Sequence, residues 1–261
     1  MNKVISKDGT TIVYDKTGNG PAVILVDGAF CSRNFGPMPK LTPLLAKSFT
    51  VFTYDRRARG DSGDTQPYAI QREIEDIDAL IKVAGGFAYL FGISSGAVLC
   101  IKAVASGLNI TKLALFEPPF NIGSRQRQPP ADGEEQLTKM IAAHKKSDAV
   151  KFYLTKVIGL PAIVPFIMQL TPNWSKMKAN ANSLPYDAAI MGNFLMPIDQ
   201  VSAVKVPTIV IDSEKSPEAL RKPAQVVAET LPNAQRRSLK GQVHNVPPEV
   251  LAPVLVDFYN N

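Results

Sequence analysis

Cysteine and histidine are scarce in this chain. Its 261 residues include two cysteines, Cys31 and Cys100, and two histidines. Two separately placed cysteines are too few for a disulfide framework or a zinc site, and we expect no bound metal and no cofactor. Cys100 lies in an apolar helical run, where a thiol is usually a small buried side chain. Neither cysteine is therefore a candidate for chemistry.

Long apolar runs and clusters of like charge are also missing. The longest nearly uncharged apolar stretch covers residues 157–168, well short of the roughly 20 residues of a membrane-spanning helix. The net charge is +6, but the basic residues are scattered, without the runs typical of nucleic-acid binding. Charged residues follow Met1 at once, without the apolar core of a secretory leader. We therefore expect a cytoplasmic protein that spans no membrane and binds no nucleic acid.

The pattern of the chain predicts an α/β fold. Short β-branched and aromatic runs alternate with longer helical runs, which is typical of a mostly parallel sheet with helices on both faces. Strands are expected at residues 10–14, 22–26, 50–54, 88–91, 113–116 and 208–211, with a weaker one at 235–239. We expect the first two to form a hairpin-like edge.

A long central segment departs from this alternation. From residue 121 to 203 the chain consists of helical pieces interrupted by prolines, before strand character resumes. We interpret residues 121–203 as an inserted helical cap. Residues 1–120 and 204–261 then form the α/β core domain.

One segment carries the strongest chemical signal. Residues 92–96 read G-I-S-S-G between an apolar strand and a buried helix. A serine in this pattern lies on a sharp, strained turn that exposes its hydroxyl at the carboxyl edge of the sheet. Ser94 has the two glycines at the required spacing, whereas Ser95 has Ile93 and Ala97 there instead. Ser94 is therefore the candidate nucleophile.

A serine hydroxyl needs a base to take its proton, and the chain has two histidines. His144 lies in a charged part of the predicted cap and is most simply a solvent-exposed side chain. His244 follows the last predicted strand, in the loop before the final helix, at the same sheet edge as Ser94. The order of nucleophile first and histidine last belongs to one serine-hydrolase architecture. His244 is the candidate base.

With these residues in place, the chain resembles the α/β-hydrolase superfamily over nearly its whole length. Residues 25–30, L-V-D-G-A-F, follow a strand where the family often has His-Gly-x, and residues 54–62, Y-D-R-R-A-R-G-D-S, match a common family loop. The resemblance implies a mostly parallel sheet of eight strands, helices on both faces and a helical cap. It also implies an oxyanion hole formed by the backbone N–H groups of Ala29 and Ser95.

Two groups of charged residues lie near these motifs, one at Asp27 and one around Asp55. Asp27 replaces the histidine of the family pattern. It either places a negative charge near the oxyanion hole or pairs with a cation such as Arg56 or Arg57. We interpret Asp55, with Arg57 and Asp61, as a salt-bridged scaffold of its loop.

The acid of the catalytic triad departs from the usual family pattern. In most relatives it lies a few residues after the strand that here ends near Asp212, at a point where this chain has Ser216. Asp212 and Glu214 are near enough to substitute. Some relatives, including a group of dehalogenases, take the acid from the end of the preceding strand, and that position is Glu117. Glu117 is our first choice for orienting His244 and Asp212 the second, with a dyad or purely structural roles of these carboxylates left open.

These residues predict a cofactor-free serine hydrolase that cleaves a small or medium ester-like carboxylic substrate through an acyl-enzyme. A serine at the turn, where an aspartate would be required, argues against haloalkane dehalogenase or epoxide hydrolase chemistry. An alternative from another class is a small-molecule binding or sensing protein with weak or no turnover. Ser216 and Asp27, the two departures from the pattern, keep that alternative open.

Overall fold

Eight strands form a single sheet in the computed structural model, which describes residues 1–122 and 128–261. The strand order is β1-β2-β4-β3-β5-β6-β7-β8. β1 pairs with β2 and β2 with β4 in antiparallel fashion, and every other neighbouring pair is parallel. The predicted mostly parallel sheet is thus confirmed. The strands are β1 Asn2–Ile5, β2 Thr11–Thr17, β3 Ala22–Val26, β4 Thr50–Tyr54, β5 Ala88–Ile93, β6 Ile110–Phe116, β7 Thr208–Ser213 and β8 Ala234–Leu239.

The antiparallel edge differs from the expected hairpin. β2 pairs with β1 and β4, whereas β3 lies inside the sheet, parallel to β4 and β5. The hairpin prediction was wrong because β3 is buried along its whole length, which is typical of a strand covered on both faces. β1 was missed because its four side chains are mostly exposed and carry no clear alternation.

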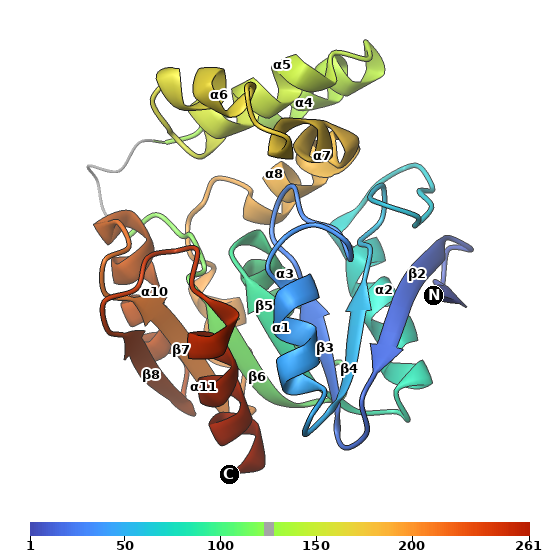
Figure 1. The fold of residues 1–261 in the computed structure, drawn as a ribbon, viewed down its shortest axis with the longest axis vertical. Helices are drawn as coiled ribbons and strands as arrows, with labels where there is room; N and C mark the ends of the chain where they lie inside the picture. The colour runs from blue at the N-terminus through green and yellow to red at the C-terminus, as the bar shows by residue number, and fades with distance from the viewer. Residues whose placement is uncertain (123–127) are drawn as a thin grey trace.

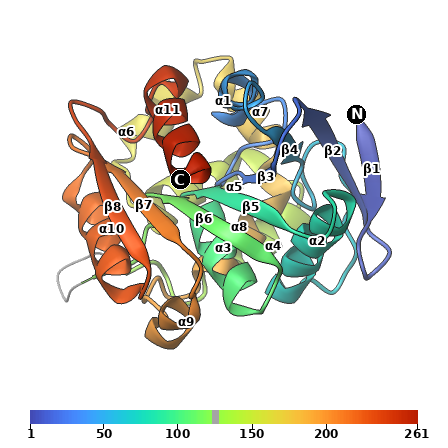
Figure 2. The ribbon, with the colours of Figure 1, turned by 90° about the horizontal axis from the view of Figure 1, so that it is seen from below.

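Helices cover both faces of the sheet (Figure 2). Val23 and Leu25 of β3 pack in the cluster on one face, and Ile24 and Val26 pack in the cluster on the other. This alternation follows from the two-residue period of a strand. The first face carries α1 Met38–Leu45 and α11 Pro248–Asn260. The second carries α2 Ile70–Val83, α3 Ser95–Ala105, α9 Ile198–Ala203 and α10 Glu218–Thr230.

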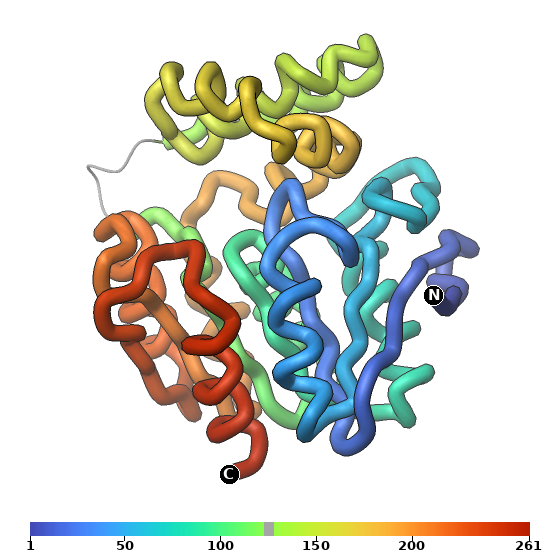
Figure 3. The backbone as a smooth tube through the Cα atoms, viewed as in Figure 1, coloured from blue at the N-terminus to red at the C-terminus, as the bar shows by residue number. Residues whose placement is uncertain are grey.

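The chain between β6 and β7 forms a further set of helices. In Figures 1 and 3, the helices from α4 to α7 lie together beyond one end of the sheet. They have a hydrophobic cluster of their own, which includes Tyr153 and Trp174, and Phe30 of the core joins it. These elements are α4 Gly133–Ala142, α5 Lys146–Phe152, η1 Tyr153–Val157, α6 Ile163–Met168, α7 Asn173–Ala179, η2 Ala181–Ser183 and α8 Leu184–Met191.

The inserted segment returns to the sheet layer before residue 203. Ile190 and Met191, at the end of α8, belong to the hydrophobic cluster on the α3 face, and so does Val201 of α9. Residues 123–127 of the predicted cap lie outside the described residues. In the rest of the chain, no helix has both the length and the apolar character needed to cross a membrane.

Candidate active site

Ser94 lies at the turn between β5 and α3, with φ 55° and ψ −126°. A non-glycine residue rarely adopts this conformation, which costs on the order of 1–3 kcal/mol and persists only where the surroundings hold it. The Ser94 N–H donates to the carbonyl oxygen of Phe116 at 3.0 Å, which fixes the turn against the end of β6. The strained turn expected from the G-I-S-S-G pattern is present.

The two glycines of this turn allow its close packing. A Cβ at Gly92 would lie 2.6 Å from the Cys100 sulfur, and one at Gly96 would lie 2.4 Å from the carbonyl oxygen of Val26. Both distances are well inside van der Waals contact. Only glycine therefore lets α3 start directly against the end of β3, where the predicted oxyanion loop begins.

His244 lies in the loop between β8 and α11, and its Nδ1 is 2.5 Å from Oε2 of Glu117. The Glu117 side chain is fully buried, and its other oxygen, Oε1, accepts the Ser213 N–H at 2.8 Å. Both carboxylate oxygens are therefore held in place. With Nδ1–H donating to Glu117, the lone pair of a neutral imidazole is at Nε2. This is the arrangement that a general base requires.

The turn and the histidine–glutamate pair converge on the end of β6. Phe116, whose carbonyl holds the Ser94 N–H, immediately precedes Glu117, and its ring centroid is 5.8 Å from that of His244. The hydrogen bonds among the described residues do not include one between Ser94 and His244. In a substrate-free hydrolase such a contact often forms only when the substrate binds.

Asp212, the second candidate acid, has a different partner. Its Oδ2 accepts from Arg236 at 2.7 Å (Nε) and 2.5 Å (Nη2). Ser216 is buried, and its hydroxyl has no hydrogen-bond partner among the residues that the structure describes. Glu214 accepts the N–H of Gly241 at 2.7 Å. The structure therefore brings Glu117 to His244 and directs the charge of Asp212 elsewhere.

The two amides expected to form an oxyanion hole donate to no acceptor in the described part of the chain. Among the described residues, no backbone or side-chain oxygen accepts the N–H of Ala29 or of Ser95. The chain at Gly28 passes beside Ser94, the candidate nucleophile, since a Cβ there would lie 3.7 Å from Ser94 Oγ. Unpaired N–H groups beside a nucleophile are what a developing oxyanion requires.

Asp27 is buried just before these amides. Burial raises the pKa of its carboxyl to about 8, although the charges of Arg59 and Arg56 oppose the rise. Oδ1 has no hydrogen-bond partner within residues 1–122 and 128–261, and Arg56 donates at 3.2 Å to the main-chain carbonyl oxygen of Asp27. This shift favours the neutral carboxyl at pH 7, which reduces the negative charge near the predicted oxyanion hole.

Comparison with known proteins identifies the family. Residues 23–251 match the sequence model of the alpha/beta hydrolase family. This chain belongs to the alpha/beta hydrolase family. The crystal structure of an alpha/beta hydrolase from Sphaerobacter thermophilus DSM 20745 is 45% identical and has a TM-score of 0.92, with 99% of this chain and 100% of that chain covered.

Two further proteins are similar to this chain. The esterase RhEst1 from Rhodococcus sp. ECU1013 has a TM-score of 0.71 at 17% identity, with 100% of this chain and 98% of that chain covered, and shows the shared fold alone. The uncharacterized hydrolase YraK of Bacillus subtilis (strain 168) is 33% identical over 109 residues, 39% of this chain. The match spans 40% of the length of that curated relative.

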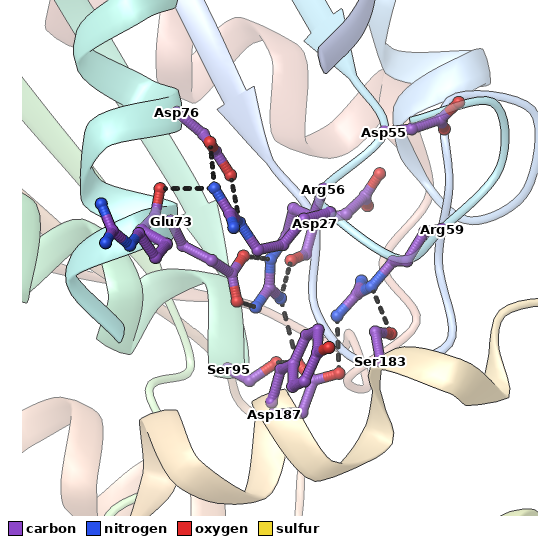
Figure 4. A network of polar contacts seen from close by, with 12 residues as sticks. Asp27, Asp55, Arg56, Arg59, Glu73, Asp76, Ser95, Ser183 and Asp187 are labelled. Carbon is purple, nitrogen blue, oxygen red and sulfur yellow. Dashed lines mark hydrogen bonds and ion pairs between the residues drawn. The ribbon is translucent and has the colours of Figure 1, made fainter. Parts of the chain in front are cut away.

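This alpha/beta hydrolase also contains a buried charged residue that the sequence patterns did not single out. Asp187 of α8 accepts hydrogen bonds from Arg56 at 2.9 Å, from Arg59 at 2.6 Å and from the Ser95 hydroxyl at 2.8 Å (Figure 4). Arg56 also binds Glu73 through two hydrogen bonds. A signal was available in the sequence, because Asp187 is the only charge in an apolar helical run and an unpaired buried charge is costly.

The salt-bridged loop expected around Asp55 exists in this family member, but with other partners. Asp55 accepts from the Nε and backbone N–H of Arg33, which also pairs with Asp61 at 2.7 Å. Arg57 pairs instead with Asp76 at 2.7 Å. The predicted pairing of Asp55 with Arg57 was wrong because the Arg57 guanidinium donates to both carboxylate oxygens of Asp76, and Arg33 occupies Asp55 in its place.

The remaining histidine and cysteines are not part of this site. His144 is exposed at the end of α4, as expected. Cys100 is fully buried behind Gly92, and burial raises the pKa of both cysteine thiols above its usual range. Within residues 1–122 and 128–261, no group of three or more His, Cys, Asp or Glu residues is arranged to hold a metal ion.

Proposed function

We propose that this protein is a serine hydrolase that cleaves small or medium ester-like carboxylic substrates through an acyl-enzyme. The observation that carries the proposal is the contact between His244 Nδ1 and the buried Glu117 carboxylate, beside the strained turn at Ser94. A nucleophile, a base and an acid that orients the base are the three roles of a catalytic triad. Membership of the alpha/beta hydrolase family supports the same reading.

The first half of the reaction forms the acyl-enzyme. Ser94 Oγ attacks the carbonyl carbon while its proton passes to His244 Nε2. The carbonyl oxygen becomes an oxyanion and accepts hydrogen bonds from the N–H groups of Ala29 and Ser95. When the tetrahedral intermediate collapses, the bond to the leaving alcohol breaks and the alkoxide takes the proton from His244.

The second half releases the acid product. A water molecule attacks the acyl carbon and gives its proton to His244, and the collapse of the second intermediate returns that proton to Ser94 Oγ. Glu117 stabilises the imidazolium that forms twice in each cycle. The net reaction consumes one water and yields one carboxylic acid and one alcohol.

An apolar acyl group suits the surroundings of the proposed oxyanion hole. Phe30, next to Ala29, is packed in the hydrophobic cluster of the inserted helices with Tyr153 and Trp174, and Ala29 borders that cluster. A carbonyl oxygen bound at Ala29 would therefore bring the rest of the substrate close to apolar side chains. This favours small or medium apolar esters over charged ones.

The alternative of a binding protein without turnover rested on two features of the sequence. One was the absence of an acid at Ser216. Glu117 is buried and lies within hydrogen-bond distance of His244, so it can supply the acid instead. The other was a charge at Asp27, whose raised pKa of about 8 favours the neutral carboxyl at pH 7. Neither feature now favours the binding protein.

The test is covalent labelling by a fluorophosphonate followed in time, together with hydrolysis of p-nitrophenyl acetate. The native chain is expected to label within minutes and to hydrolyse the ester. Ser94→Ala is expected to abolish both activities, and His244→Ala is expected to reduce both by about a thousandfold or more. Ser106→Ala, an exposed serine at the end of α3, is the matched control and is expected to behave like the native chain. A native chain that neither labels nor turns over the ester contradicts the proposal.

A further inference from the structure

Arg59 contacts the backbone of the loop after β3, which contains Ala29 and the proposed oxyanion amide. Its Nη1 donates to the carbonyl oxygen of Gly28 at 2.5 Å and to that of Cys31 at 3.2 Å. The Gly28 carbonyl and the Ala29 N–H belong to one planar, trans peptide and therefore point in opposite directions. A hydrogen bond that holds the carbonyl toward Arg59 thus holds the Ala29 N–H toward the opposite side, away from the guanidinium.

The second oxyanion amide is fixed by a neighbouring contact. Ser95 is the first residue of α3, and its hydroxyl donates to Asp187 Oδ1 at 2.8 Å. Its own N–H has no acceptor among the described residues. Because the side chain is tied down, the first turn of α3 has a fixed orientation, and so has this N–H.

Asp187 accepts hydrogen bonds from both Arg59 and the Ser95 hydroxyl, and so links the two contacts described above. Its Oδ2 accepts from Arg59 at 2.6 Å, and its Oδ1 accepts from both Ser95 and Arg56. Arg59 Nε also donates to the hydroxyl of Ser183 at 2.7 Å. Figure 4 shows these side chains converging from the loop after β4, from α3 and from α8. One carboxylate of the inserted segment therefore holds both elements that carry the oxyanion amides.

The charges of this cluster balance. Arg56 and Arg59 face Asp187 and Glu73, and all four side chains are almost completely buried. Burial alone would raise the pKa of Asp187, but Arg59 and Arg56 lower it below its usual value, so that the carboxylate is ionised. A buried cluster of this kind adds little net stability compared with apolar packing, yet it fixes the positions of its members closely.

We propose that Asp187 and Arg59 are positioning residues that orient the two oxyanion amides, those of Ser95 and Ala29, through the Ser95 hydroxyl and the Gly28 carbonyl. The inference rests on the proposed serine-hydrolase function. It makes α8 a fixed support of the catalytic centre. Any movement of the inserted helices that displaces α8 would then disturb the oxyanion hole itself.

The experiment compares two ketone inhibitors of the same shape. A trifluoromethyl ketone adds to Ser94 and forms an oxyanion, whereas the matching methyl ketone binds largely without doing so. Ser95→Ala is expected to weaken binding of the trifluoromethyl ketone and to lower kcat/KM, each by about 5-fold. Arg59→Lys is expected to change both quantities in the same direction, each by about 30-fold or more. The methyl ketone is expected to change by less than about 2-fold, because it does not depend on the oxyanion amides.

Asp76→Asn is the matched control. It breaks the buried ion pair with Arg57, whose recorded contacts include neither Gly28 nor Ser95. It is expected to lower Tm without changing the ratio of the two inhibition constants. Asp187→Asn is expected to change that ratio most, and the two milder variants keep the test valid if this variant does not fold.

The outcomes separate the two proposals. A native chain that neither labels with a fluorophosphonate nor hydrolyses esters overturns both the proposed function and this inference. An active native chain whose inhibitor ratio is the same in Ser95→Ala, Arg59→Lys and Asp76→Asn overturns the inference alone. The inference is supported if the inhibition constant of the methyl ketone divided by that of the trifluoromethyl ketone falls in Ser95→Ala and Arg59→Lys and not in Asp76→Asn.

Discussion

Glu117 and His244 are 127 positions apart in the chain, and the structure places Oε2 of the first 2.5 Å from Nδ1 of the second. The contact arises from neighbouring parallel strands. Phe116 pairs with Ile211 at the ends of β6 and β7, and the Glu117 N–H donates to the Ile211 carbonyl oxygen at 3.0 Å. The positive φ of Glu117, 44°, turns the chain there. A carboxylate at the end of β6 thereby reaches the histidine loop that follows β8.

The role of Glu117 can be separated from that of Asp212 by exchanging each for its amide. Glu117→Gln is expected to reduce ester hydrolysis by about 10³–10⁴-fold, because an amide neither fixes the imidazole tautomer nor stabilises the imidazolium. Asp212→Asn is expected to retain activity within about 3-fold and to lower Tm, since Arg236 loses its charged partner. Steady-state hydrolysis and thermal melting of both variants measure these effects.

The reverse pattern would assign the acid differently. If Asp212→Asn lost activity and Glu117→Gln kept it, Asp212 would have to leave Arg236 during the reaction and replace Glu117 at His244. Equal, small losses in both variants would instead indicate a dyad in which the carboxylate contributes little.

The glycines of the turn give a prediction about folding. Gly96→Ala is expected to lower the free energy of unfolding by about 2 kcal/mol or more, because its Cβ would meet the Val26 and Asp27 carbonyl oxygens at 2.4 and 2.6 Å. Gly133→Ala, at the start of α4, is the control, because a Cβ there would meet no atom of the described residues within 4 Å. Urea denaturation of the two variants and the native chain measures the difference. Equal stability of Gly96→Ala and the native chain would mean that α3 can shift away from β3.

Local patterns explain which parts of the site could be predicted from the sequence. Ser94 and its glycines form one contiguous motif, and the scarcity of histidine leaves His244 with few competitors. The alternation of strands and helices likewise predicted the sheet and its helical faces. The choice between Glu117 and Asp212 stayed open because both carboxylates follow or end buried strands at the same sheet edge.

Contacts between distant segments account for what the sequence did not predict. Arg59 and Asp187 are 128 positions apart, and nothing in the loop after β4 indicates which helix supplies its counter-charge. The partners of Asp55 could not be read from neighbouring residues either, because Arg33 reaches it from another loop. Such pairings depend on how distant segments of the chain pack together, and the secondary-structure propensity of the local sequence does not indicate this.

The backbone strain at Ser94 predicts that two inactive variants differ in stability. Ser94→Gly and Ser94→Ala both remove the nucleophile and are expected to be inactive. Glycine accepts φ 55° and ψ −126° readily, whereas alanine does not, so Ser94→Gly is expected to be more stable than Ser94→Ala by about 1 kcal/mol. Chemical denaturation of the two variants measures this. A Ser94→Ala variant as stable as Ser94→Gly would show that the turn relaxes once the hydroxyl is gone.

The buried carboxyl of Asp27 predicts how stability changes with pH. Burial raises its pKa to about 8, with Arg59 and Arg56 opposing the rise and Asp55 adding to it. The unfolded chain loses this proton near pH 4, whereas the folded protein keeps it until about pH 8. Between these values the folded state binds more protons than the unfolded state, so the contribution of Asp27 to stability is lost as pH rises and is constant above about pH 9.

Asp27→Asn isolates this effect because the amide keeps the shape and cannot ionise. The stability of the native chain relative to Asp27→Asn is expected to fall between pH 5 and pH 8, by up to about 1.4 kcal/mol for each pH unit. Titrations of other groups cancel in the difference between the two proteins. Urea denaturation at pH 5, 6.5, 8 and 9.5 measures it. Parallel stability curves for the two proteins would mean that Asp27 is ionised in the fold, with Arg59 and Arg56 compensating its charge.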